Sequence, residues 1–212
     1  SYFESTDHSP FSEKMWMGVA DFPQKDWDFV SNRIHAYDIE IVPLFINKIV
    51  YKDYYNGFSN SVIWPLFHYF PGFLDYQMHY FDAYKRVNKL FAEQLLPLLK
   101  PDDTIWVHDY QLMLLPALLR AEKPELTIGF FLHIPFPSYE MYRMLPAAWK
   151  EALLEGVLGA DLVGFHTHDY VQHFLQSVKM ILGIDSHFLA IQYHDRLVRA
   201  DLFPIAIDFR KF

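Results

Sequence analysis

The chain has 212 residues, of which 52% are hydrophobic and 18% aromatic, enough to bury the core of one domain. Its 26 acidic residues exceed its 18 basic ones, so the net charge of -8 gives no reason to expect a nucleic-acid or anionic-membrane partner. Cysteine is absent, which excludes disulfides, thiolate catalysis and thiolate metal ligands in this chain.

Neither the N-terminal stretch nor the apolar runs carry a targeting signal. Residues 1–14 are polar and charged, unlike a secretory signal peptide. The most apolar runs, such as Ile128–Leu132, are far shorter than a stretch that crosses a bilayer. Together with the absence of cysteine, these features predict a cytoplasmic protein with no membrane partner.

The first half of the chain alternates strand and helix patterns. Residues 39–45 are apolar and rich in β-branched side chains, broken only by Glu40 and Pro43, and predict a strand. Residues 80–99 carry apolar side chains mostly three or four apart, which predicts an amphipathic helix. Pro101-Asp102-Asp103 ends that helix, and residues 104–107 then predict a short strand followed by a helix over 111–120.

The second half continues the alternation. The apolar run Ile128–Leu132 predicts a buried strand, and the prolines at 135 and 137 forbid its continuation as helix or ladder. The remaining elements are a helix over 139–156 that Pro146 must bend or split, a strand over 161–165, a helix over 168–182 that stops at Gly183, and closing extended segments over 197–208.

This alternation predicts a single α/β domain over residues 1–212, with a Rossmann-like parallel sheet and helices on both faces. In such a sheet, ligands bind beyond the carboxyl ends of the strands. Three segments place polar residues at predicted strand ends: TIWVHDYQLMLLP (104–116), IGFFLHIPFPS (128–138) and DLVGFHTHDY (161–170).

The dipeptide His108-Asp109 follows the predicted strand over 104–107. A carboxylate there can accept hydrogen bonds from sugar hydroxyls. Two other interpretations stay open: Asp109 can cap the helix that follows, or His-Asp can be the metal pair of a phosphohydrolase. The metal reading is disfavoured because no persuasive set of further ligands accompanies the pair.

Three histidines occupy the other predicted strand ends. His133 precedes a proline-rich loop that fixes the backbone, so its imidazole can be held rigidly for a sugar ligand. The alternative is a buried histidine bonded to a backbone carbonyl. His166 and His168 resemble a metal pair, but without a third ligand nearby we interpret them as polar loop residues.

The segment over 54–69, YYNGFSNSVIWPLFHY, fits neither a clean helix nor a clean strand. It gathers hydroxyl, amide and indole donors that suit phosphate or sugar oxygens. The alternative is a turn at Asn56-Gly57 with Trp64 and Phe67 anchoring the core. The donors are Tyr55, Asn56, Ser59, Asn60 and Trp64.

In this order, the motifs YYNGFSN, HDY and GFFLHIPFPS, with Trp16-Met17-Gly18 before them and FPIAID after them, resemble the trehalose-6-phosphate synthase family of retaining glycosyltransferases. The resemblance implies the N-terminal half of a two-domain GT-B enzyme, with no cofactor and no essential metal. It also implies glucose transfer from UDP-glucose to glucose 6-phosphate with retention, giving trehalose 6-phosphate without a covalent protein intermediate.

The resemblance also assigns residues. It implies that Tyr55 and Trp64 contact the glucose 6-phosphate acceptor, Tyr55 through the phosphate. Asp109 would bond the acceptor hydroxyls and His133 would lie beside the transferred glucose, so these two are the expected catalytic residues. The implied partners are glucose 6-phosphate and a nucleotide sugar, with UDP-glucose expected.

The sequence departs from the family pattern in three places. The family's first strand, with its Arg and glycine-rich loop, and its C-terminal donor-binding domain are not found. Residues 30–33, Val-Ser-Asn-Arg, resemble that first strand but lie too close to Tyr54 and lack a following glycine pair, so we expect helix or loop over 28–33. Ala206 replaces a usual glycine.

These departures predict an acceptor-side fragment that is inactive alone and that can form homo-oligomers through an exposed sheet edge. One alternative is a non-catalytic regulatory or scaffold homologue, although the four assigned residues are all retained. Another is a related enzyme with a different sugar or cyclitol acceptor.

Overall fold

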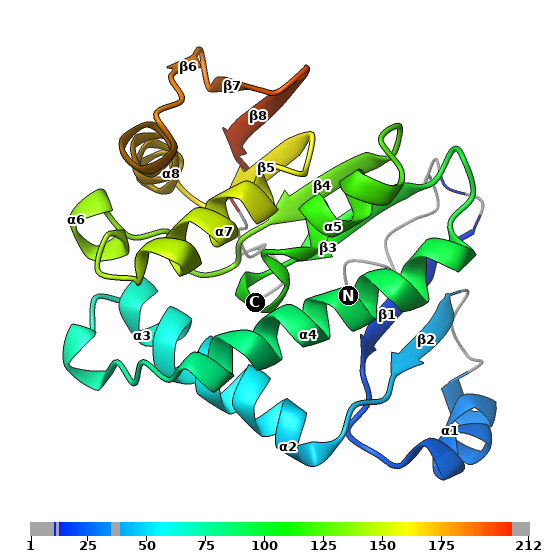
Figure 1. Ribbon diagram of the computed structural model, residues 1–212. Coiled ribbons are helices and arrows are strands. Elements are labelled where there is room, and N and C mark those ends of the chain that lie inside the picture. Colours follow the sequence, from blue (N-terminus) through cyan, green and yellow to red (C-terminus); the bar gives the residue numbers. More distant parts are fainter. Residues whose placement is uncertain (1–10, 12, 35–38, 205–212) are drawn as a thin grey trace, which may run out of the picture. The chain divides into compact units, whose positions relative to one another are not determined.

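A computed structural model describes residues 11, 13–34 and 39–204, and its contacts divide the chain into two compact units, Ser1–Asn47 and Lys48–Phe212 (Figure 1). The single domain expected over residues 1–212 stays a prediction. Ala206 and most of the FPIAID motif lie outside the described residues.

The first unit contains a two-stranded parallel sheet and a helix. Strand β1 (Met15–Val19) pairs with β2 (Glu40–Leu44), which confirms the strand expected over 39–45. A short 3₁₀ turn (Gln24–Asp26) leads into α1 (Trp27–Ile34). Helix α1 confirms the helical reading of residues 28–33 and excludes this segment as a first strand.

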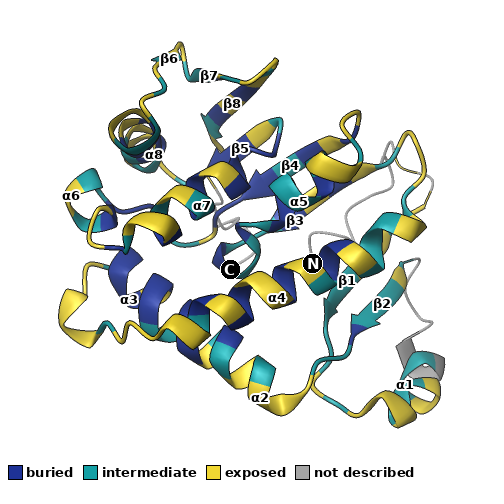
Figure 2. Ribbon diagram, viewed as in Figure 1, coloured by how far each residue is buried: buried dark blue, intermediate teal, exposed yellow. Residues whose placement is uncertain are grey.

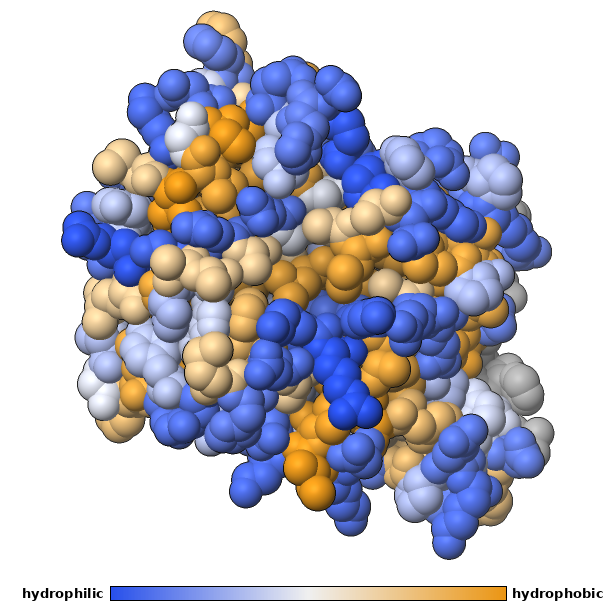
Figure 3. Space-filling view, in the orientation of Figure 1, coloured by the Kyte–Doolittle hydropathy of each residue, from blue (hydrophilic) through white to orange (hydrophobic). Residues whose placement is uncertain are grey.

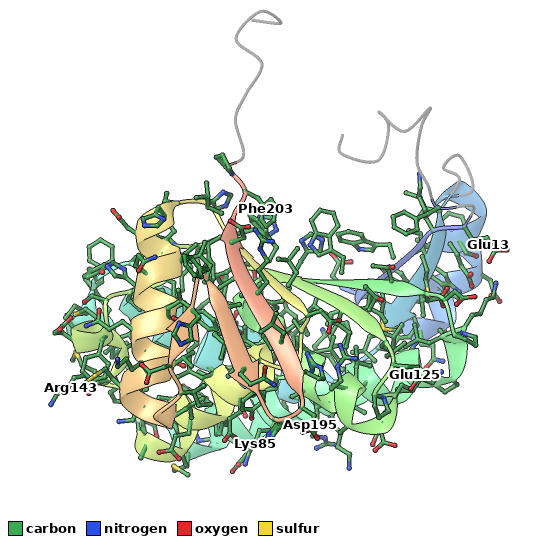
Figure 4. All side chains as sticks on the ribbon, turned by 90° about the horizontal axis from the view of Figure 1, so that it is seen from above. Glu13, Lys85, Glu125, Arg143, Asp195 and Phe203 are labelled. Carbon is green, nitrogen blue, oxygen red and sulfur yellow. The ribbon has the colours of Figure 1, made fainter. Side chains whose placement is uncertain are left out.

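The second unit is built on a six-stranded sheet in the order β3-β4-β5-β8-β7-β6. The strands β3 (Thr104–His108), β4 (Thr127–Phe131), β5 (Leu162–Phe165) and β8 (Arg196–Leu202) are parallel. In Figure 4, Phe203 marks the carboxyl end of β8, and Asp195 marks the turn that precedes it. The α/β class is confirmed.

The sheet is mixed rather than purely parallel, which corrects the prediction. The short strands β6 (Ser186–His187) and β7 (Ala190–Tyr193) add to its edge in antiparallel orientation. Both strands are too short for a periodic apolar pattern to reveal them. The turn between them places Phe188 at φ 48° and Leu189 at φ 67°, although neither residue type is typical of such turns.

Helices fill the connections of the second unit. The 3₁₀ turn over Tyr110–Leu112 precedes α5, so this helix starts later than expected, and Pro146 separates α6 from α7 as predicted. Helix α8 ends at Gly183, whose left-handed conformation, with a φ of 71°, is favourable only for a residue without a Cβ. The helices are α2 (Lys48–Tyr51), α3 (Trp64–Phe67), α4 (Met78–Leu95), α5 (Leu115–Glu122), α6 (Tyr139–Tyr142), α7 (Ala147–Val157) and α8 (His168–Leu182).

The segment over 54–69 is mostly helical, so the alternative of a turn at Asn56-Gly57 is wrong. A π-helical stretch, η2 (Lys52–Ile63), joins α2 directly to α3. Its hydrogen bonds reach five residues back, as from the Trp64 N–H to the Ser59 carbonyl. The wider turn places the buried residues of η2 in groups about four positions apart, which hides the ordinary helical period. The groups are Tyr54, Gly57–Ser59 and Val62–Ile63.

Gly57 lies within η2 because the helix packs closely on α4. A Cβ at this position would lie 2.5 Å from the ring of Tyr80. The ring of Phe58, also in η2, lies 5.0 Å from that of Phe81 and 4.5 Å from that of Tyr84, both in α4. The Asn-Gly pair therefore reflects helix packing, not chain reversal.

Figure 2 shows buried residues along the central strands β4 and β5, and strand pairing places buried residues of four strands on one face of the sheet. Val107, Phe130, Val163 and Ala200 form a buried row across four strands. Phe165 extends this face and packs on Phe174 of α8, with ring centroids 5.3 Å apart.

Residues of the opposite face are more accessible, since Trp106 is 45% and Leu162 37% exposed. A layer of helices on that second face stays a prediction. The space-filling view shows hydrophilic and hydrophobic groups interspersed on the face drawn (Figure 3). Within the described part of the chain, none of the helices is both long enough and apolar enough to span a bilayer.

Candidate functional site

The carboxyl ends of three parallel strands bring the predicted strand-end motifs together. Asp109 follows β3, His133 comes two residues after β4, and His166 follows β5. The strands are adjacent and in parallel register, so these polar residues meet at one edge of the sheet. This is the edge at which open α/β sheets bind ligands.

Asp109 is held by bonds to the neighbouring strand. Its backbone N–H donates to the Phe131 carbonyl at 2.8 Å, and its carboxylate Oδ1 accepts from the His133 N–H at 3.0 Å. The following 3₁₀ turn receives no side-chain cap from Asp109. The capping interpretation is therefore wrong, because the carboxylate reaches across the sheet edge instead.

The backbone of Asp109 is strained. Its φ of 72° and ψ of 173° fall in a region that is essentially restricted to glycine. Residues in such conformations persist only where their surroundings hold them, and they cluster at ligand sites. The strain therefore indicates Asp109 as a candidate ligand-binding residue, independently of any sequence motif.

Burial raises the pKa of the Asp109 carboxyl. The backbone N–H groups of Tyr110 and His133 and the imidazoles of His133 and His166 act in the opposite direction and lower this pKa. The half-buried carboxylate is therefore poorly solvated and only partly compensated by protein donors. A ligand hydroxyl could supply one of the hydrogen bonds that water otherwise provides.

The two histidines at the ends of β3 and β4 are bonded to each other. Nδ1 of His108 lies 2.9 Å from Nε2 of His133. Burial, then His133, lowers the pKa of His108 to about 4, and loss of solvation also lowers the pKa of His133. His133 is exposed and pairs with a ring nitrogen, so the alternative of a buried histidine bonded to a backbone carbonyl is wrong.

The metal interpretations of these histidines find no support. His166 lies near His133, with ring centroids 5.9 Å apart, whereas His168 is exposed at the start of α8. Among the residues that the structure describes, no group of three or more His, Cys, Asp or Glu could hold a metal ion.

The η2–α3 segment reaches the residue that follows Asp109 through a side-chain hydrogen bond. The Tyr110 hydroxyl donates to Asn60 Oδ1 at 2.9 Å, and Tyr110 directly follows Asp109. Tyr55 contributes to the raised pKa of Tyr110, about 12, after burial. Between the described atoms of Tyr55 or Trp64 and those of Asp109 or His133 there is no hydrogen bond. Their roles in the site therefore stay predictions.

Trp64 does not anchor the core, which corrects one part of the structural alternative. It is 40% exposed and stacks on His68, with ring centroids 4.1 Å apart. Phe67 is fully buried and does anchor the core. Tyr55 is half-buried and stacks on Tyr51 at 5.2 Å.

Sequence reasoning missed the residues that support the loop after Asp109. The buried Tyr84 hydroxyl donates to the Tyr110 carbonyl at 2.7 Å and accepts from the Met113 N–H at 2.9 Å. Asn88 Nδ2 and the Tyr54 hydroxyl both donate to the Gln111 carbonyl, at 3.1 and 3.3 Å. The available signal was a polar pair, 84 and 88, on the apolar stripe of a helix.

Comparison with known proteins gives the family. The sequence model described as glycosyltransferase family 20 matches residues 4–212. The α,α-trehalose-phosphate synthase [UDP-forming] A of Dictyostelium discoideum is 48% identical over 175 residues, which is 82% of this chain but 24% of that protein. The chain spans 24%, 36% and 42% of the length of three such curated relatives.

Solved structures agree with the sequence match. A UDP-forming α,α-trehalose-phosphate synthase from Burkholderia xenovorans in complex with glucose 6-phosphate has a TM-score of 0.78 and 33% identity, over 91% of this chain and 43% of that one. An E. coli structure, described as trehalose-6-phosphate bound with UDP-2-fluoro glucose, has a TM-score of 0.81 and 33% identity, over 93% of this chain and 43% of that one. The chain belongs to glycosyltransferase family 20.

Proposed function

We propose that this chain is the acceptor-side part of a UDP-forming α,α-trehalose-phosphate synthase of the two-domain GT-B type. The whole enzyme transfers glucose from UDP-glucose to glucose 6-phosphate with retention and releases trehalose 6-phosphate. Two relatives support the substrates, since one was solved with glucose 6-phosphate and another with UDP-2-fluoro glucose. The 212 residues alone hold the acceptor side and do not turn over.

The observation that carries the proposal is the Asp109 carboxylate, which a strained backbone holds against the backbone N–H of His133. A half-buried carboxylate with few protein donors suits hydroxyl groups of a sugar. Asp109 binds the acceptor hydroxyls, and His133 lies beside the transferred glucose. Tyr55 and Trp64 offer a hydroxyl and an exposed aromatic face from η2 and α3, for the phosphate and ring of the acceptor.

In this proposal the chain acts through positioning and electrostatics. Asp109 and His133 orient the acceptor hydroxyl toward the donor sugar, and the leaving phosphate of the donor helps to remove the hydroxyl proton. A carboxylate nucleophile and a metal ion are not needed for this route. We infer that the enzyme works in the cytoplasm, which agrees with a cysteine-free sequence, and that it forms homo-oligomers.

Ligand-observed NMR with glucose 6-phosphate tests the acceptor site on this chain. We expect saturation transfer to the sugar that is lost in Asp109→Asn, which keeps the side-chain shape but removes the charge. Asp195→Asn is the matched control, because Asp195 lies exposed at the β7–β8 turn (Figure 4). Glucose should bind more weakly than glucose 6-phosphate, and Tyr55→Phe should reduce that difference.

Binding that is equal in wild type and Asp109→Asn would contradict the assigned site. The assay of the whole reaction requires a longer protein that also contains the donor-binding part. If such a protein binds both substrates but releases no trehalose 6-phosphate, the regulatory or scaffold alternative replaces the enzymatic one.

A further inference from the structure

The hydrogen bond between His108 and His133 has a chemical consequence of its own. A neutral imidazole carries one N–H donor and one bare acceptor nitrogen. The 2.9 Å contact between Nδ1 of His108 and Nε2 of His133 therefore pairs a donor with an acceptor. Once one ring donates, the protons on both rings are placed, and the two tautomers are coupled.

Both rings are neutral near neutral pH, because their pKa values are lowered. Nε2 of His133 is occupied by His108, so Nδ1 must take the opposite hydrogen-bonding role. Among the described residues, Nδ1 of His133 has no hydrogen-bond partner. It is the ring atom that remains for a ligand.

The surrounding contacts leave little freedom to this pair. His108 is the last residue of β3 and pairs in register with Phe131. The His133 backbone N–H is bound to Asp109, so the ring of His133 retains only its side-chain rotations. The bond to His108 restrains these rotations, and Phe131 lies against the ring, with centroids 4.7 Å apart.

We propose that His108 is a positioning residue, which fixes the orientation and tautomer of His133 through the bond between their rings. Nδ1 of His133 then meets a sugar hydroxyl in one defined role, as donor or as acceptor but not both. The identity of that ligand rests on the proposed function, whereas the coupling of the two rings does not.

His166 is the other imidazole that could influence His133. Its ring centroid lies 5.9 Å from that of His133 in an edge-on arrangement, and no hydrogen bond joins the two rings. Besides this ring contact, its charge lowers the pKa of His133. Replacement of His166 is therefore a matched control that changes a neighbouring imidazole without breaking the bond.

The test reads the ring nitrogens directly. In the ¹⁵N-histidine-labelled 212-residue chain, long-range ¹H–¹⁵N spectra distinguish protonated from bare nitrogens, and His133→Gln identifies the signals of His133. We expect one predominant neutral tautomer at His133 in the wild type. In His108→Phe, which keeps a ring but removes Nδ1, we expect the two nitrogen signals to move toward each other as both tautomers become populated.

A second pair of variants keeps the test valid if His108→Phe does not fold. The amide of His108→Asn can occupy the place of Nδ1 and should preserve a single tautomer. The longer side chain of His108→Gln cannot place its amide there, so this variant should show a mixture of the two His133 tautomers. His166→Asn should leave the His133 nitrogen signals separated.

The proposal is overturned if folded His108→Phe or His108→Gln shows the same His133 tautomer as the wild type, or if the wild type already shows a mixture. Titration with glucose 6-phosphate is read separately from the same samples. A single His133 tautomer that depends on His108, without binding of glucose 6-phosphate, would refute the proposed function but not the coupling. Binding of glucose 6-phosphate to a chain in which the His133 tautomer does not depend on His108 would refute the coupling but not the proposed function.

Discussion

Replacing Asp109 by glycine and by alanine separates backbone strain from the loss of the carboxylate. Both changes remove the charge and the hydrogen bond to the His133 N–H. Only glycine also removes the Cβ that makes φ 72° and ψ 173° unfavourable. The stabilities of the two variants therefore differ through the backbone strain of the folded state and through the conformational entropy of the unfolded chain.

The expected difference follows from two opposing terms. A non-glycine residue in such a conformation costs about 1–3 kcal/mol. Glycine gives back about 0.5–1 kcal/mol, because its unfolded state is more flexible. We therefore expect Asp109→Gly to be more stable than Asp109→Ala by about 1 kcal/mol, the difference between the midpoints of these ranges, and by at most about 2.5 kcal/mol. Neither variant should bind glucose 6-phosphate.

Urea unfolding followed by circular dichroism measures this difference, provided that the denaturant slope is unchanged. Asp195 supplies the control, because it is exposed and its φ is not positive. At position 195 the order should reverse, with alanine more stable than glycine. An alanine variant at 109 that equals or exceeds the glycine variant in stability would refute the assignment of strain to Asp109.

Three further predictions concern the surroundings of the site. Tyr84→Phe should lower the free energy of unfolding by about 2–4 kcal/mol, because the buried Tyr84 hydroxyl has two backbone partners. Tyr142→Phe should lower it by about 1 kcal/mol, because the Tyr142 hydroxyl has one backbone partner. Equal urea midpoints for the two variants would contradict this. Gly159→Ala should lose more than about 2 kcal/mol or fail to fold, since its Cβ would lie 2.2 Å from the Ala117 N; a thermal melt like that of the wild type is the contrary result. Stability should fall as pH drops from 6.5 to about 4, because the unfolded chain protonates His108 before the folded chain does. Urea midpoints across this range should fall less in His108→Phe, and identical pH profiles would exclude His108 as a contributor.

The parallel part of the sheet was predictable because its strands are continuous apolar runs bounded by turn residues. Residues 104–107, 128–132 and 161–165 all lie in strands or at their ends. The hairpin of β6 and β7 was not predictable from the sequence, because its turn uses Phe188 and Leu189 at positive φ. Turn recognition relies on glycine and asparagine at such positions.

The η2 segment shows a second limit of sequence reasoning. Its buried residues fall in groups about four positions apart, at Tyr54, Gly57–Ser59 and Val62–Ile63, and its backbone N–H groups bond to carbonyls five residues back. Neither the 3.6-residue period of an α-helix nor the alternation of a strand describes this pattern. A glycine inside it then resembles a turn signal, although the close approach of Tyr80 requires it.

Local sequence patterns could not predict which residues form hydrogen bonds with the site residues. The carboxylate of Asp109 could have capped the next turn, as a local rule suggests, but its partner is the His133 N–H, 24 positions away. The same holds for the His108–His133 bond, which spans 25 positions. The order of the motifs predicted which residues matter, while strand register decides which of them touch.

The strain at Asp109 needs a rigid frame, and the supporting bonds supply one. Tyr84, Asn88 and Tyr54 bind backbone groups of three of the next four residues after Asp109. A loop so firmly held cannot relax Asp109 into a favourable backbone conformation. A purely structural role at this position would be better served by glycine, which has no strain there. The retention of a carboxylate at a stability cost therefore argues that Asp109 is held in place for a ligand, in agreement with the rule that local inconsistencies mark functional sites.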